Sequence, residues 1–311
     1  MIANFFYPFT NNSPANQARG VLRWFRAHYP EAQVLEWDFL GVPRQPRFEP
    51  PENADLNFVF DMSHLFFHQG RELRQRLRGP VLVGSIVPYE LENGPIPHTA
   101  VDYQLIVGRL GADADPRQAQ IGYLLPEECL QPAKPALPLA LIDHWRQGHP
   151  EDHGGNLECS PSHTRANYEV ARRVLADLHI PIVELGRHNQ DYGPEQIFDL
   201  YRRCHFFFLT FYECFGLPLL ENLAAGNWIV APSRTWLRER HLADSPGFFS
   251  WDWDRGRLRA MLEREKAAIL AGPAGYAERR HSEQSAWVRR EYRHEDRLAE
   301  VVECCLARRR P

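Results

Sequence analysis

The stretch that decides the fold runs from residue 205 to residue 232 and reads His-Phe-Phe-Phe-Leu-Thr-Phe-Tyr-Glu-Cys-Phe-Gly-Leu-Pro-Leu-Leu-Glu-Asn-Leu-Ala-Ala-Gly-Asn-Trp-Ile-Val-Ala-Pro. Residues 206–209 form a short, wholly apolar run, which is typical of a strand buried on both faces. Apolar residues recur at helical spacing over 217–225, and Gly226 stands where a helix C-terminus favours glycine. Because residues 228–230 begin a second buried strand, the stretch predicts a strand–loop–helix–strand unit.

The loop of this unit brings Phe215, Gly216 and Leu217 to the start of the predicted helix. Free backbone N–H groups and the positive end of the helix dipole meet there, which favours a phosphate group. Gly216 permits a ligand to approach the backbone closely. Glu213 and Glu221 flank this anion site, and a carboxylate accepts hydrogen bonds from hydroxyl groups rather than binding phosphate. Two hydroxyl-binding groups around a diphosphate site predict a nucleotide sugar as the ligand.

The segment from Glu213 to Gly226 resembles the E-x7-E signature of retaining glycosyltransferases of the GT-B fold, the family-4-like group. Both glutamates, the Phe-Gly-Leu-Pro turn and the Ala-Ala-Gly exit match that signature, whereas a plain buried strand and helix would need none of them. The resemblance implies an α/β chain of two doubly wound Rossmann-like domains that face a cleft. It also implies transfer of a sugar from a nucleotide diphosphate sugar to an acceptor with retention of configuration. In this family the first glutamate binds the donor sugar and the second, here Glu221, binds the ribose hydroxyls.

Composition indicates a soluble globular protein with room for two domains, because 44% of the 311 residues are hydrophobic and 24% are charged. The formal net charge of −4 argues against nucleic acid as the main partner. No apolar run approaches the roughly 20 residues that a membrane span needs. The first residues lack a basic segment and are better explained as a strand than as a signal peptide. Six cysteines without metal spacing favour reduced thiols and a cytoplasmic protein.

Alternating apolar runs and helical patterns predict a first domain over 1–134 and a second over 135–311, joined by a proline-rich linker at 131–138. The resemblance implies that the final helices pack back on the first domain. The predicted strands cover residues 2–7, 33–37, 56–60, 81–87, 103–107 and 121–125, then 139–142, 180–185, 206–209, 228–230 and 248–249. The predicted helices cover residues 21–27, 163–178, 194–203 and 217–225, a stretch near 256–270 and one near 283–307.

Polar residues follow the predicted first-domain strands. Ligands of doubly wound folds bind beyond the carboxyl ends of strands, so Asn11, Asn12 and Ser13 are predicted to lie on the acceptor side. They replace the glycine-rich loop that the resembling enzymes have at this point. His64 follows the strand over 56–60 and resembles the family's first-domain histidine near the donor sugar, although a structural role explains a single histidine equally well.

Four further residues of the second domain are candidates for donor binding. Arg187 and His188 follow the strand over 180–185 and are predicted to border the base, and His144 follows the strand over 139–142. The resembling enzymes neutralise the departing diphosphate with an Arg and a Lys after that first strand, and this chain has no such pair there. Arg146 and Arg187 are the available substitutes, because a guanidinium binds phosphate through two donors at once.

The sequence offers one pattern that suggests a metal. Asp252-Trp253-Asp254 has the D-x-D spacing that binds a divalent metal in the other glycosyltransferase fold, GT-A. A three-residue pattern is a weak signal, and Asp113-Ala114-Asp115 repeats it elsewhere in the chain. We therefore expect neither a metal nor a cofactor, and a nucleotide diphosphate sugar as substrate.

The acceptor is not encoded in a recognisable motif, and a glycan or lipid-linked glycan is favoured over a protein or nucleic acid. The basic segment 71–78 is either a solvated helix face, which we favour, or a contact with an anionic membrane. Two other functions fit the same fold. A sugar-nucleotide epimerase would turn over the donor without an acceptor, and a noncatalytic subunit would bind the donor without releasing nucleotide.

Overall fold

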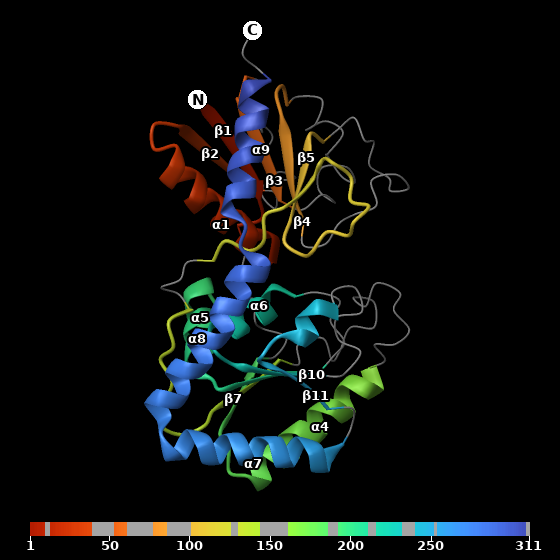
Figure 1. Cartoon of the computed structure of the whole chain (residues 1–311), viewed down its shortest axis with the longest axis vertical. Coiled ribbons are helices and arrows are strands. Elements are labelled where there is room, and N and C mark those ends of the chain that lie inside the picture. The colour runs from red at the N-terminus through yellow and green to blue at the C-terminus, as the bar shows by residue number, and fades with distance from the viewer. Residues whose placement is uncertain are drawn as a thin grey trace. The chain divides into compact units, whose positions relative to one another are not determined.

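The computed structural model describes residues 1–9, 13–38, 53–60, 77–85, 101–125, 130–143, 161–185, 192–210, 216–231, 240–251 and 254–308. The chain divides into two compact α/β units (Figure 1). The first comprises Met1–Leu125 and Glu291–Pro311, and the second comprises Pro126–Arg290. The division that we placed after residue 134 therefore falls inside the second unit.

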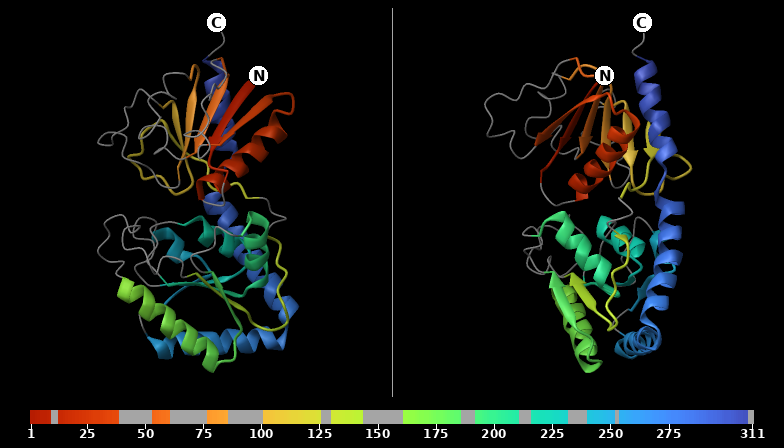
Figure 2. Two further views of the ribbon diagram at one scale, coloured as in Figure 1. Left: turned by 180° about the vertical axis from the view of Figure 1, so that it is seen from behind. Right: turned by 90° about the vertical axis from the view of Figure 1, so that its left-hand side faces the viewer.

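The first unit contains a six-stranded parallel sheet in the order β2-β1-β3-β4-β5-β6. The strand order reverses between β1 and β3, as in a doubly wound fold. Helices α1 (Ser13–His28) and α9 (Glu295–Ala307) cover one face of this sheet (Figures 1 and 2). The strands are β1 (Ile2–Tyr7), β2 (Gln33–Asp38), β3 (Leu56–Phe60), β4 (Val81–Ser85), β5 (Tyr103–Ile106) and β6 (Gln118–Gln120).

An aromatic cluster forms the core between this sheet and its helices. The rings of Phe5 and Phe58 stack with centroids 4.5 Å apart, and Phe25 of α1 meets Phe5 edge-on at 5.6 Å. Leu298 and Val302 of α9 are fully buried in the same cluster. The end of the chain thus completes the core of the first unit.

The second unit contains a five-stranded sheet in the order β11-β10-β9-β7-β8, and its strands are again parallel. Helices α4 (Pro161–Asp177) and α7 (Arg255–Ala271) share the core on one face. Helix α5 (Pro194–Arg203) contacts the other face through Tyr201, whose ring meets Phe207 edge-on at 5.8 Å. The strands are β7 (Ala140–Asp143), β8 (Ile182–Leu185), β9 (Phe206–Leu209), β10 (Trp228–Ala231) and β11 (Phe248–Ser250). The predicted doubly wound α/β class is confirmed.

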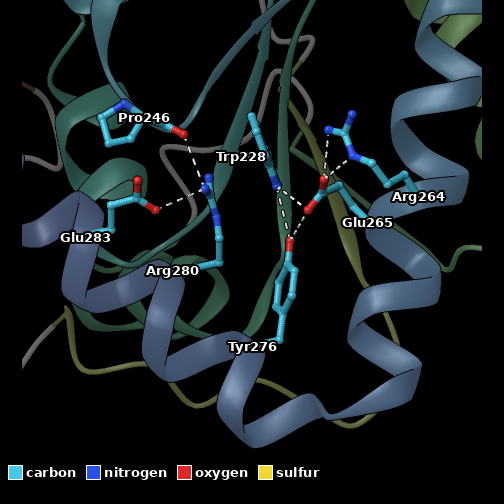
Figure 3. A network of polar contacts seen from close by, with 7 residues as sticks. All are labelled: Trp228, Pro246, Arg264, Glu265, Tyr276, Arg280 and Glu283. Atoms are coloured by element: carbon cyan, nitrogen blue, oxygen red, sulfur yellow. Dashed lines mark hydrogen bonds and ion pairs between the residues drawn. The ribbon is translucent and has the colours of Figure 1, made fainter.

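The remaining helices of this unit are α6 (Leu217–Ala224), the 3-10 helix η7 (Arg240–Asp244) and α8 (Pro273–Tyr292). Polar contacts hold α7 and α8 to the amino end of β10 (Figure 3). The indole Nε1 of Trp228 donates to Glu265 Oε2 and lies 3.1 Å from it, and the Tyr276 hydroxyl donates to the same oxygen at 2.9 Å. The guanidinium carbon of Arg280 lies 4.1 Å from the centroid of the Trp228 ring. Burial and the neighbouring Glu265 raise the pKa of Tyr276, so its hydroxyl remains a donor.

Two of the predicted elements are wrong, for one shared reason. Residues 121–125 are not a strand, and the predicted helix near 283–307 is interrupted between α8 and α9. Gly122 bridges Arg293, and the Tyr123 amide donates to the Tyr292 carbonyl at 2.6 Å. A Cβ on Gly122, whose φ is +70°, would lie 1.9 Å from that carbonyl oxygen. The two segments therefore pair with each other, which ends the sheet at β6 and breaks the helix.

Candidate functional site

The strand order of the second unit reverses between β7 and β9, so the carboxyl ends of these strands mark the expected ligand site. Asp143 ends β7 and is 4% exposed. The Thr210 hydroxyl, just after β9, donates to the Asp143 carbonyl at 3.2 Å. Asn167 of α4 donates to the Thr210 carbonyl at 3.0 Å. These buried contacts fix the two strand ends relative to each other.

Helix α6 begins beyond the carboxyl end of β9. Its N-cap residue is Gly216, with φ −122° and ψ 130°, and Leu217 and Pro218 follow as the first helical residues. Glycine has no side chain to satisfy the first amides of the helix, where serine or aspartate commonly does so. The C-terminus is closed instead by Gly226, whose φ is +80°, and by the Asn227 amide, which donates to the Asn222 carbonyl at 2.9 Å. This pairing is the Schellman motif, and it confirms the predicted helix end.

Glu221 lies one turn into α6 and is 2% exposed. Its charge acts on the phenol of Tyr201 of α5, which is 3% exposed. Burial first, and then the charges of Glu221 and Asp143, raise the pKa of Tyr201 well above its usual value. Both negative charges therefore act on one neutral, buried phenol. A carboxylate at the position of Glu221 can accept hydrogen bonds from ligand hydroxyls near the start of α6.

The fold brings three of the predicted site residues together on one element, since Gly216, Leu217 and Glu221 all belong to α6 or its cap. Ser13 is the first residue of α1 in the other unit. The other candidates lie outside the described residues: Asn11, Asn12, His64, His144, Arg146, Arg187, His188, Glu213 and Phe215.

Asp143 and Tyr201 were not among the residues predicted for this site, although the charges of Asp143 and Glu221 both act on Tyr201. Asp143 is a polar residue at the end of an apolar run, and this signal was available for it in the sequence. Tyr201 shows no comparable signal, because it belongs to the apolar face of an amphipathic helix. Its proximity to Glu221 depends on where α5 and α6 lie on the sheet.

The predicted acceptor side corresponds to the carboxyl end of β1 in the first unit. There the Tyr7 hydroxyl donates to Glu36 of β2, and the Phe9 amide donates to Asp38 Oδ1 at 3.1 Å. Burial and the bond to Glu36 raise the pKa of Tyr7, so its phenol stays neutral. Phe9 is 50% exposed beside these polar groups. This edge combines an exposed aromatic ring with carboxylates.

Two of the four aspartates in the D-x-D patterns have other partners, and Asp252 lies outside the described residues. Asp254 caps α7 by accepting from the Arg257 amide at 2.9 Å, and Asp115 pairs with Arg117 at 3.0 Å. Within the described ranges, no group of three His, Cys, Asp or Glu side chains could hold a metal ion. No helix in the same ranges is long and apolar enough to cross a bilayer.

Comparisons by sequence and by structure give different results. No protein-family model matches the chain, and no curated protein sequence matches it. Solved structures do match over nearly the whole length. HepE of Anabaena in complex with UDP-glucose is 10% identical, with a TM-score of 0.54 over 98% of this chain and 99% of that chain.

Two further structures give the same result. Sucrose-phosphate synthase of Thermosynechococcus elongatus is 14% identical, with a TM-score of 0.53 over 97% of this chain and 96% of its own. A glycosyltransferase of Rickettsia africae is 10% identical, with a TM-score of 0.57 over 99% of both chains. At these identities the likeness is one of fold. The chain has the GT-B fold of these proteins.

Proposed function

We propose that this chain is a nucleotide-sugar-dependent glycosyltransferase that acts with retention of configuration and without a metal. The observation that carries the proposal is helix α6. It has a glycine cap, begins at the carboxyl edge of the sheet where the strand order reverses, and carries the buried Glu221 one turn later. An uncapped helix N-terminus favours a diphosphate, and a carboxylate favours the neighbouring ribose hydroxyls.

The proposed role of each residue in donor binding follows from the chemistry of its polar groups. The amides from Phe215 to Leu217 bind the diphosphate, Glu221 binds the ribose and Glu213 binds the donor sugar. As the glycosidic bond breaks, charge develops on the leaving diphosphate, and the helix dipole stabilises it without reorganising. The leaving phosphate oxygen accepts the proton of the attacking acceptor hydroxyl. Arg146 or Arg187 supplies the positive charge that the resembling enzymes obtain from an Arg and a Lys.

Further members of the site follow from the resemblance. His64 lies near the donor sugar, His144 and His188 lie on the donor side, and the segment from Asn11 to Ser13 faces the acceptor. The acceptor is a glycan or lipid-linked glycan, and the protein works in the cytoplasm. Segment 71–78 is the candidate for contact with a membrane that holds a lipid-linked acceptor.

A thermal-shift screen of nucleotide sugars tests the proposal, because a ligand that binds only the folded protein raises its melting temperature. UDP-glucose is the first donor to examine, since HepE was solved with it. We expect one nucleotide sugar to raise the melting temperature, and its nucleotide to be released only with an acceptor. If no nucleotide sugar stabilises the protein, the proposal is wrong.

One observation favours a second function. The chain lacks the Arg and Lys pair of the resembling enzymes, so a noncatalytic donor-binding subunit is the alternative. It would be stabilised by the donor and release no nucleotide with any acceptor. An epimerase would convert the donor with no acceptor present. Nucleotide release and donor composition, measured with and without acceptor, separate the three.

A further inference from the structure

Lys134 makes an unusual set of contacts in the segment that leads into β7. Its ammonium donates to the Tyr201 carbonyl at 3.2 Å, to the Cys204 carbonyl and to the Asn227 side-chain oxygen. The two carbonyls belong to the C-terminus of α5, where the negative end of the helix dipole favours a cation. Part of the Lys134 side chain remains exposed, and the part enclosed by the protein is the ammonium group. A residue in a predicted linker is thus anchored at the amino side of the second sheet.

The contacts continue from Lys134 into α6. Asn227 donates to Asn222 Oδ1 at 2.6 Å, and Asn222 donates to the Pro218 carbonyl at 2.7 Å. Both asparagines are fully buried. Pro218 lies in the first turn of α6, beside the glycine cap, and Asn222 is adjacent to Glu221. A single chain of polar contacts therefore connects the ammonium with the turn that carries the predicted donor site.

The hydrogen-bonding capacity of the Lys134 ammonium matches its surroundings. Three N–H donors meet three oxygen acceptors, and no carboxylate among the described residues forms an ion pair with it. Burial lowers the pKa of Lys134 to about 8. The titratable neighbours are neutral near that pH, because burial raises the pKa of Cys204 to about 12 and lowers that of His205 to about 3. A neutral amine has only two donors, so its formation leaves one of the three acceptors unmatched.

We propose that Lys134 is a positioning residue, which holds the first turn of α6 in its binding geometry through Asn227 and Asn222. The proposal rests on the proposed function for its consequence in donor binding, but not for the positioning itself. Lys134 touches neither donor nor acceptor. It acts from the amino side of the sheet on a helix whose other end presents the anion site.

Hydrogen exchange of the α6 amides measures the positioning without any ligand. In Lys134→Met, we expect these amides to exchange at least tenfold faster than in the wild type, while those of α7 keep their protection. Lys266→Met is the matched control, because Lys266 is the only other lysine and donates to the Leu178 carbonyl at 2.6 Å, away from α6. Asn222→Ala breaks the same chain and leaves the buried ammonium with its acceptors, so it tests the proposal even if Lys134→Met fails to fold. Unchanged α6 protection in a folded Lys134→Met, or in Asn222→Ala, overturns the proposal.

Titration of the wild type provides a readout that general destabilisation would not move. A protein labelled with ¹⁵N only at lysine shows two side-chain signals, and Lys266→Met assigns them. We expect the Lys134 signal to titrate near pH 8. As the pH rises through this value, the protection of the α6 amides, corrected for intrinsic exchange, should decrease with the same midpoint. If the amine titrates and α6 protection does not follow it, the positioning role is wrong.

Donor binding then connects the positioning with function. With the nucleotide sugar found in the screen, Lys134→Met should bind at least tenfold more weakly than the wild type and Lys266→Met equally well. An unchanged donor affinity alongside faster α6 exchange would overturn the link between Lys134 and the site. If no nucleotide sugar binds the wild type, the proposed function fails, and the exchange experiment still decides the role of Lys134.

Discussion

Replacing Glu221 by glutamine examines the donor role of α6 most directly. Glutamine has the same shape and keeps one acceptor oxygen, so the buried site loses a charge without gaining a cavity. A hydrogen bond to a charged group contributes about 1.5–3 kcal/mol and a neutral one about 0.5–1.5, a difference of about 1–1.5 per bond. A ribose offers two hydroxyl groups, so we expect donor binding to weaken by about 2–3 kcal/mol. This corresponds to a roughly 30- to 160-fold higher Kd, which calorimetry resolves.

Glu265→Gln is the matched control for this measurement. Glu265 is also a buried carboxylate of the second unit, 8% exposed, but it accepts from Trp228 and Tyr276 at the amino end of β10. We expect this variant to lose about 2–3 kcal/mol of unfolding free energy, because the two bonds from Trp228 and Tyr276 become neutral ones. Its melting temperature falls by several degrees, whereas its donor affinity stays that of the wild type.

The comparison of the two variants decides between a binding role and a structural role for Glu221. If Glu221→Gln is folded and binds the donor as tightly as the wild type, Glu221 does not contact the ribose. Equal losses of affinity in both variants would show that affinity follows the stability of the unit, and Glu221 would have no specific role in donor binding.

Four other perturbations have defined outcomes. Glu213→Gln should lower the single-turnover rate more than donor affinity, because a carboxylate stabilises positive charge that develops on the sugar in the transition state; a lower melting temperature with normal turnover would make Glu213 a helix cap. A chelator should leave activity unchanged, and activity restored by Mn²⁺ after chelation would contradict this. Gly226→Ala should lower the unfolding free energy by about 1–3 kcal/mol or more. The φ of residue 226 is +80°, and the added Cβ would lie 2.9 Å from the His281 backbone. Burial lowers the pKa of His205 to about 3, whereas in the unfolded chain this histidine binds a proton below about pH 6.5. The unfolding free energy should therefore decrease as the pH is lowered from about 6.5 to about 3. The decrease should be less steep in His205→Phe, which lacks the titrating group.

Most of the fold follows from local patterns in the sequence. Strands such as Phe206–Leu209 are buried on both faces and therefore are continuous apolar runs. The end of α6 is equally local, because a positive φ at Gly226 suits glycine. The end of the first sheet was not predictable in this way. It depends on the pairing of Gly122 with Arg293, and these residues are distant in sequence and have no complementary pattern.

The candidate site also contains some residues that local sequence patterns predict and others that they do not. The glycine cap and Glu221 belong to one motif, and the sequence predicts their proximity because a helix fixes it. Asp143 joins them only because β9 lies beside β7 in the sheet, and Tyr201 only because α5 lies near α6. These neighbours are determined by the arrangement of strands and helices in the fold, which local sequence spacing does not predict.

The length of α6 explains why its anchoring matters for function. Isolated helices shorter than roughly 12–15 residues are marginal in water, and α6 has eight residues. Its glycine cap leaves the first amides to a ligand and so contributes little to holding the helix. The position of the anion site must therefore come from the rest of the fold. The buried side chains of α6 pack within the second unit, the Schellman turn at Gly226 ends the helix, and the contacts from Asn222 through Asn227 reach Lys134. A helix that leaves its N-terminus open for a phosphate has to be held by the rest of its length, and Lys134 contributes to that support from the amino edge of the sheet.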